Sequence, residues 1–192
     1  MYTDLMLDLE TVSTRNNAAI VSIGYQFFNP TTEEFGPNKE IVIDTTYAVE
    51  PEFNPGYHVC ARTMNWWSKQ GAEAKRIFED VNNVSISYGL ELLIDEILDH
   101  SEANDLLVWG NGSTFDITIL KNAFLLSHDS EPPWQHENVR DVRTLVAIGR
   151  LFGIDPKVDI EFTGVKHNAA DDAKHQAVYC TAIHQLLLAK AN

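Results

Sequence analysis

Two carboxylates stand one residue apart near the N-terminus, in the stretch LMLDLET (residues 5–11). Alternate side chains of a β-strand point to the same face, so Asp8 and Glu10 share one face and the leucines share the other. Like charges this close repel each other unless a cation lies between them or one carboxylate is protonated. The pair therefore indicates either a cation site or a strand end at which water hydrates both acids.

Two further segments place acids where helices are expected to begin. Asp116 follows the turn GNGS, and Asp171 and Asp172 open the last helix just after His167. Acids are common in the first turn of a helix because they complement the helix dipole, so neither segment is specific by itself. The order of the three segments along the chain carries more weight than any one of them.

In this order the three segments resemble the motifs of DEDD-type 3′–5′ exonucleases, in the histidine-bearing DEDDh branch of the ribonuclease H-like superfamily. Asp8 and Glu10 match the first motif, Asp116 the second, and His167 with Asp172 the third. The segments TMNWWSKQGAEAK and VRDVRTL are also similar to the group that contains phage exonuclease A and small bacterial exoribonucleases. The resemblance covers nearly the whole chain.

The resemblance implies a metal-dependent exonuclease that hydrolyses single-stranded RNA or DNA from the 3′ end to nucleoside 5′-monophosphates. Two Mg²⁺ ions, for which Mn²⁺ would substitute, suit a carboxylate cluster because hard cations prefer oxygen ligands. By resemblance Asp8 would bind both ions, Glu10 and Asp172 the first, and Asp116 the second. His167 would be the general base, a task that suits an imidazole near neutral pH.

Aromatic side chains are expected to hold the nucleotide at the 3′ end, because they stack on bases without regard to sequence. The substrate-binding candidates are Thr11, Phe115, Trp66 and Trp67. One of two adjacent helical tryptophans usually faces the core, so a packing role stays open for each.

Basic residues occur in two groups for which alternatives remain open. The first group either contacts phosphates or forms a solvated helix face, and comprises Arg62, Lys69, Lys75 and Arg76. The second is expected to cap and brace the helix that follows it, and comprises Arg140, Asp141, Arg143 and Thr144. Its arginines would otherwise contact a phosphate or a partner subunit.

The composition excludes several classes of protein. Lys and Arg number 14 against 28 Asp and Glu, a formal net charge of −14, which disfavours non-specific binding to duplexes. Hydrophobic residues make up 44% of the chain, which excludes a wholly disordered protein. No membrane span and no secretory signal are expected. Two cysteines fit a reduced compartment, so we expect a cytoplasmic protein, in the host cytoplasm if the gene is phage-encoded.

Hydrophobic periodicity predicts the elements that carry these residues. Strands are expected at 3–10, 17–30, 40–44 and 105–110. Helices are expected at MNWWSKQ, with Thr63 as its cap, through EAKRIF, and at 90–100, 114–127, 142–153 and 169–190. The helix at 90–100 is expected to bury one stripe, made of Leu90, Leu93, Ile94, Ile97 and Leu98.

Strands first, followed by strands that alternate with helices, predict an α/β fold in a single domain over residues 1–192. With the resemblance, this is a ribonuclease H-like mixed sheet, its first three strands antiparallel and helices on both faces. Rival interpretations are a proofreading subunit of a replication complex, a binding module without catalysis, and a structural acidic domain. The preference for RNA or DNA, and a homodimer, stay open.

Overall fold

Five strands form one mixed sheet in the order β3-β2-β1-β4-β5. The computed structural model describes residues 1–44, 46, 56–79 and 82–191. The strand β2 is antiparallel to both of its neighbours, β1 and β3, whereas β4 runs parallel to β1 and to β5. The strands are β1 (Asp4–Thr11), β2 (Ile20–Asn29), β3 (Glu34–Val42), β4 (Leu107–Gly110) and β5 (Val139–Asp141).

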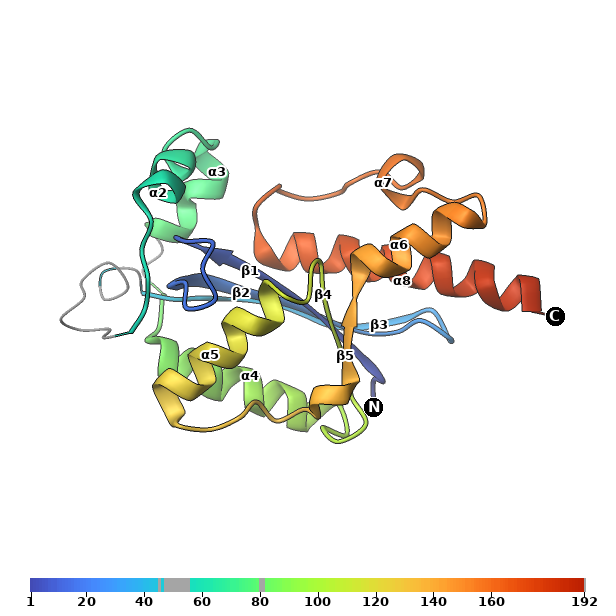
Figure 1. The fold of residues 1–192 in the computed structure, drawn as a ribbon, viewed down its shortest axis with the longest axis horizontal. Coiled ribbons are helices and arrows are strands. Elements are labelled where there is room, and N and C mark those ends of the chain that lie inside the picture. Colours follow the sequence, from blue (N-terminus) through green and yellow to red (C-terminus); the bar gives the residue numbers. More distant parts are fainter. Residues whose placement is uncertain (45, 47–55, 80–81, 192) are drawn as a thin grey trace.

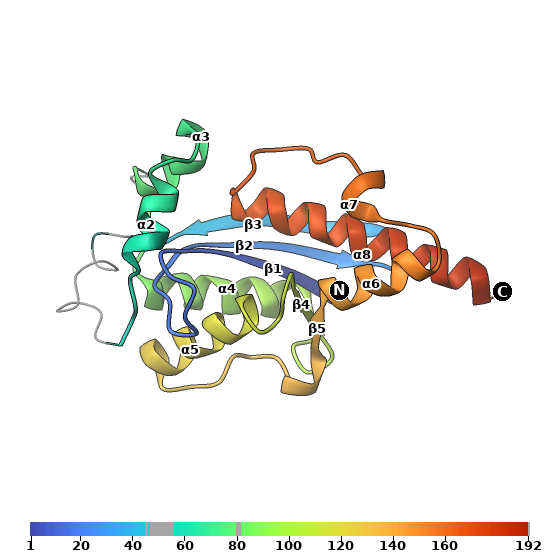
Figure 2. The same cartoon turned by 45° about the horizontal axis from the view of Figure 1, so that its top comes forward.

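Helices cover both faces of this sheet (Figures 1 and 2). One face carries α4 and α5, the other carries α6 and α8, and α2 and α3 lie past the carboxyl end of β1. The α-helices are α2 (Ala61–Trp67), α3 (Ala72–Lys75), α4 (Ile86–His100), α5 (Asp116–His128), α6 (Val142–Leu151), α7 (Pro156–Asp159) and α8 (Ala169–Ala191). Two 3-10 helices span Arg76–Phe78 and His136–Asn138. The predicted α/β fold is confirmed.

The alternation of β1 decides which of its side chains meet which helices. Leu5, Leu7 and Leu9 are buried in the cluster that contains residues of α4 and α5. Met6 lies in the cluster on the opposite face, together with residues of α6 and α8. Because side chains two residues apart share a face, Asp8 lies on the side of Met6 and α8.

Among the described residues, no helix is long and apolar enough to cross a membrane.

The helix that carries the two tryptophans begins earlier than predicted. It starts at Ala61 with Cys60 at its N-cap, so the prediction of Thr63 as the cap is wrong. The backbone N–H of Cys60 donates to the carbonyl of Val12 at 2.8 Å, and this tertiary contact sets where the helix can start.

The third strand also differs from its predicted range of 40–44. Its pairing starts at Glu34 and ends at Val42, and Ile43 continues only as an isolated bridge to Val84. The polar residues at its start obscured the strand, because this edge of the sheet has no alternating apolar face to reveal it.

Three further features were not predicted. The strand β5 has 3 residues and α7 is a single turn of 4, too short to show any periodicity. In α4 the stripe buries Leu90, Leu93 and Ile97, whereas Leu98 is 58% exposed. One residue turns the helix by about 100°, which carries Leu98 out of the stripe.

A glycine in β2 lets α8 approach the sheet. Gly24 pairs with Asp8 on one side and with Glu40 on the other, so the three residues form a row across the strands. A Cβ at Gly24 would lie 1.9 Å from the carbonyl carbon of Ala169, in the first turn of α8. The start of α8 therefore rests directly on backbone between two carboxylates.

Gly24→Ala is expected to lower the free energy of unfolding by about 1–3 kcal/mol, because helix backbone cannot yield to the added carbon as a side chain would. Gly71→Ala is the matched control, since a Cβ there would meet no atom within 4 Å. Urea unfolding of both variants measures the difference. Equal stabilities would contradict the close approach of α8 to β2.

Candidate active site

The first three acids meet because β1 and β4 are parallel and end at the same edge of the sheet. Leu7 pairs with Gly110, the last residue of β4, and Asp116 opens α5 shortly after it. The backbone N–H of Leu9 donates to Oδ1 of Asp116 at 3.2 Å. This bond fixes Asp116 beside the segment that carries Asp8 and Glu10.

The start of α8 brings the last two predicted residues to the same place. The backbone N–H of His167 donates to Oδ2 of Asp172 at 2.9 Å, and His167 has a φ of 66°. Its Nδ1 lies 3.9 Å from Oε1 of Glu10. Glu10, His167 and Asp172 each offer a ligand atom, and these atoms lie within 4.8 Å of one another. The five residues predicted from the motifs are thus neighbours.

Gln176 belongs to this site and was not predicted. Its Nε2 donates to Oδ1 of Asp8 at 2.8 Å, while its Oε1 is buried without a hydrogen-bond partner among the described residues. Its position four residues after Asp172 on a helix was the only available signal, because such residues share a face. Carboxylate oxygens together with an unpartnered amide oxygen are the donors that a hard cation prefers, so the site fits Mg²⁺ or Mn²⁺.

Burial and crowding disfavour the charged forms of these acids. Burial, and next the charge of Asp116, raise the pKa of Asp8 well above its usual range. Burial and the charge of Asp8 raise the pKa of Glu10 to about 10. Burial raises the pKa of Asp116 to about 6 and also raises that of Asp172. A bound cation would reverse these shifts, because it stabilises ionised carboxylates.

The charge of one arginine, Arg143, acts on the carboxylate cluster. Burial dominates the pKa of Asp116, but the charge of Arg143 acts in the opposite direction and lowers it. Arg143 also donates from Nε to Oδ1 of Asn111 at 3.4 Å. Asp141 caps α6 by accepting the N–H of Thr144 at 2.8 Å, which confirms the predicted capping role for these two residues.

An apolar cleft of about 410 Å³ adjoins the carboxylates at the end of β1. Its walls include Glu10, Thr11, Arg62, Trp66 and Phe115. The hydroxyl of Thr11 is committed to the backbone, since it donates to the carbonyl of Ser13 at 2.7 Å. Three of the four substrate-binding candidates therefore line one cleft.

The two tryptophans divide between the site and the core. Trp66 is 41% exposed, and its ring centroid lies 5.0 Å from that of His167. Trp67 is 2% exposed and donates from its indole nitrogen to the carbonyl of Thr11 at 2.9 Å. Trp67 thus anchors α2 to the end of β1 and does not line the cleft.

Solved exonuclease structures share this fold. Cell-death related nuclease 4 (CRN-4) has a TM-score of 0.66 at 10% identity, and the match covers 96% of this chain and 64% of that one. The nuclease domain of 3′hExo, a DEDDh family member bound to rAMP, has a TM-score of 0.62 at 14% identity, with coverage of 97% and 92%. E. coli exonuclease I in complex with dT13 has a TM-score of 0.59 at 14% identity, with coverage of 97% and 41%. The chain thus spans less than two thirds of the first and third of these proteins.

The order and direction of the strands are those of the ribonuclease H-like fold. Residues 3–184 match a family model described as the 3′–5′ exoribonuclease Rv2179c-like domain. The chain belongs to this family, which confirms the predicted likeness to 3′–5′ exonucleases, and it shares its fold with the DEDDh family member 3′hExo. No curated protein matches it by sequence.

Without divalent cations the protein is expected to lose stability as the pH rises from about 5 to about 10. The folded state binds a proton on Glu10 with a pKa of about 10, against an ordinary value of 4.5 in the unfolded chain. Folding is therefore favoured by protonation, and each such group lowers the free energy of unfolding by up to about 1.4 kcal/mol per pH unit.

Thermal unfolding in EDTA across this range measures the effect. Glu10→Gln is expected to flatten the dependence, because it removes the titrating group. Saturating Mg²⁺ is also expected to flatten it, because the ion binds ionised carboxylates. An identical slope in wild type and Glu10→Gln would contradict the raised pKa.

Proposed function

We propose that the protein is a metal-dependent 3′–5′ exonuclease that releases nucleoside 5′-monophosphates from single-stranded RNA or DNA. The observation that carries the proposal is the convergence of four carboxylates and one imidazole beside an apolar cleft. The family description favours RNA, since it specifies an exoribonuclease. In this proposal residues 1–192 act as one catalytic domain.

The carboxylates Asp8, Glu10, Asp116 and Asp172 would hold two Mg²⁺ ions, with Mn²⁺ as a substitute. Divalent cations bound there would supply positive charge against the repulsion among the carboxylates and the charge that develops on the phosphate. Hydrolysis breaks the bond between the phosphorus and the 3′-oxygen of the preceding nucleotide, so the terminal nucleotide leaves with its 5′-phosphate. His167 would accept the proton of the attacking water.

The cleft would hold the terminal nucleoside. Trp66 and Phe115 offer ring faces for a base, and such stacking accepts any base. Thr11 lines the same cleft, next to Glu10 along β1. Solved relatives of the fold support a nucleic-acid substrate, because 3′hExo was solved with rAMP and exonuclease I with dT13.

A single strand labelled at its 5′ end is expected to shorten stepwise from the 3′ end in Mg²⁺, and a blocked 3′ terminus should slow the reaction strongly. Gel analysis of RNA and DNA oligomers of the same sequence measures the direction of degradation and the preference for RNA or DNA. Asp8→Asn is the matched inactive variant, because its side chain can still accept the bond from Gln176. Cuts in a circular single strand would point to an endonuclease instead.

His167→Ala is expected to lower kcat by about 10²–10⁴-fold, the usual contribution of a general base, while Mg²⁺ affinity changes little because the carboxylates remain. The rate should also lose its fall at acidic pH. His184→Ala is the control, because His184 lies further along α8 and forms a hydrogen bond with Thr31. Full activity of His167→Ala, measured as kcat against pH, would remove the residue from the mechanism.

A further inference from the structure

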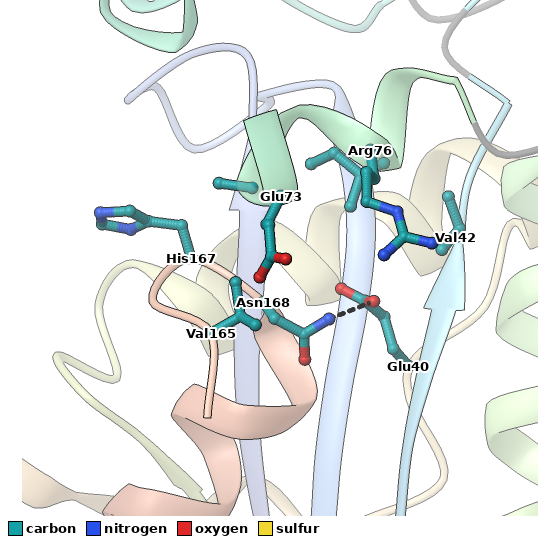
Figure 3. A pocket seen from close by; sticks show the side chains of 9 residues that line it. Glu40, Val42, Glu73, Arg76, Val165, His167 and Asn168 are labelled. Atoms are coloured by element: carbon teal, nitrogen blue, oxygen red, sulfur yellow. Dashed lines mark hydrogen bonds between the residues drawn. The ribbon is translucent and has the colours of Figure 1, made fainter. Parts of the chain in front are cut away.

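Glu40, on the edge strand β3, makes two hydrogen bonds to the start of α8. Its Oε2 accepts from Nδ2 of Asn168 at 2.7 Å, and its Oε1 accepts from the backbone N–H of Ala169 at 3.2 Å. Figure 3 shows the first of these bonds, with the carboxylate reaching from β3 to the first turn of the helix. None of the three motifs includes a residue of β3.

Asn168 is the residue through which Glu40 reaches the active site. Its Oδ1 accepts the N–H of Asp171 at 3.0 Å, so one amide group caps the helix and bonds Glu40 at the same time. His167 precedes it with a φ of 66°, a conformation that its surroundings must hold. The imidazole points away from Glu40 in Figure 3 and lies near Glu10.

We propose that Glu40 is a positioning residue, which fixes the start of α8 through Asn168 and thereby sets His167 and Asp172 against Glu10. The inference rests on the proposed function, in which His167 and Asp172 act on the substrate. The row that pairs Asp8 with Gly24 and Gly24 with Glu40 supports it, because the helix start is held between the two carboxylates.

The surroundings of Glu40 argue against a purely stabilising role. The cavity that it lines, about 200 Å³ in volume, also contains Glu73 and Arg76, yet among the described residues no ion pair joins Arg76 to Glu40. Burial raises the pKa of Glu40. Both oxygens of Glu40 are instead committed to Asn168 and Ala169, so the contribution of this carboxylate is to place the start of α8.

The test compares kcat and KM on a 5′-labelled single-stranded oligonucleotide in saturating Mg²⁺, below the melting temperature of every variant. Glu40→Ala is expected to lower kcat by about 10–100-fold, as loss of a partner that orients an active-site residue does, with KM changed by less than about threefold. Glu40→Gln should restore most of kcat, because its amide oxygen still accepts from Asn168. Glu73→Ala, from the same cavity, should match wild type.

Asn168 allows a second and independent measurement. If both residues act through one bond, Glu40→Ala combined with Asn168→Ala should lower kcat no further than the larger single effect. Hydrogen exchange at the backbone amide of Ala169 should be faster in Glu40→Ala. This rate measures how firmly the start of α8 is held, and it does not depend on catalysis. Full additivity or unchanged exchange would overturn the inference.

Should Glu40→Ala fail to fold, Glu40→Asp carries the test, because it keeps the charge and shortens the reach by one methylene. Its kcat is expected to fall, whereas a wild-type kcat would overturn the inference. An active wild type with unchanged Glu40 variants overturns this inference alone. A wild type that degrades no oligonucleotide overturns the proposed function and the inference with it.

Discussion

The structure depends on holding carboxylates closer together than their charges favour. Asp8 and Glu10 share one face of β1, and burial raises the pKa of each above its ordinary value. Packing elsewhere must supply the free energy for this arrangement, since ionised groups away from water and near like charges are unfavourable. The leucines that alternate with them provide it, because they lie in the core cluster on the opposite face. The strand β1 thus carries the unfavourable carboxylates on one face and, on the other, the leucines whose burial offsets them.

The remaining residues of the site arrive on elements whose starts are fixed by backbone contacts. The N–H of Leu9 bonds Asp116, and the N–H of His167 bonds Asp172, so the acids are located by main-chain donors. These bonds also satisfy acceptor oxygens of the buried Asp116 and the half-buried Asp172. The geometry of the site therefore follows from where β1 ends and where α5 and α8 begin.

A chain with a formal net charge of −14 offers few cationic groups to a polyanion, which makes the local arrangement decisive. In the proposed exonuclease, bound cations and apolar stacking replace a basic surface. Arg143 is placed where its charge acts on Asp116, and Trp66 faces the cleft beside His167. A short 3′ end suits such a site better than a duplex, because an acidic surface repels the phosphates of a long rigid helix.

Several features could be predicted from sequence because they have local physical causes. The alternation in LMLDLET assigns Asp8 and Glu10 to one face, and the adjacent Trp66 and Trp67 on a helix must point in different directions. The α/β class followed from the order in which strand-type and helix-type hydrophobic periodicities occur along the chain. The resemblance of three motifs indicated the family whose model residues 3–184 match.

Tertiary structure alone decided what depends on contacts between distant segments. Gln176 and Glu40 carry no motif, and they join the site only because β1, β3 and the start of α8 converge over Gly24. The strand β5 and the single-turn helix α7 are too short to show a hydrophobic periodicity. The helix expected to begin after Thr63 begins earlier, where the N–H of Cys60 donates to the carbonyl of Val12. A sequence specifies which faces are apolar over a few residues, whereas the partner of a buried polar group is set by the packing of the whole chain.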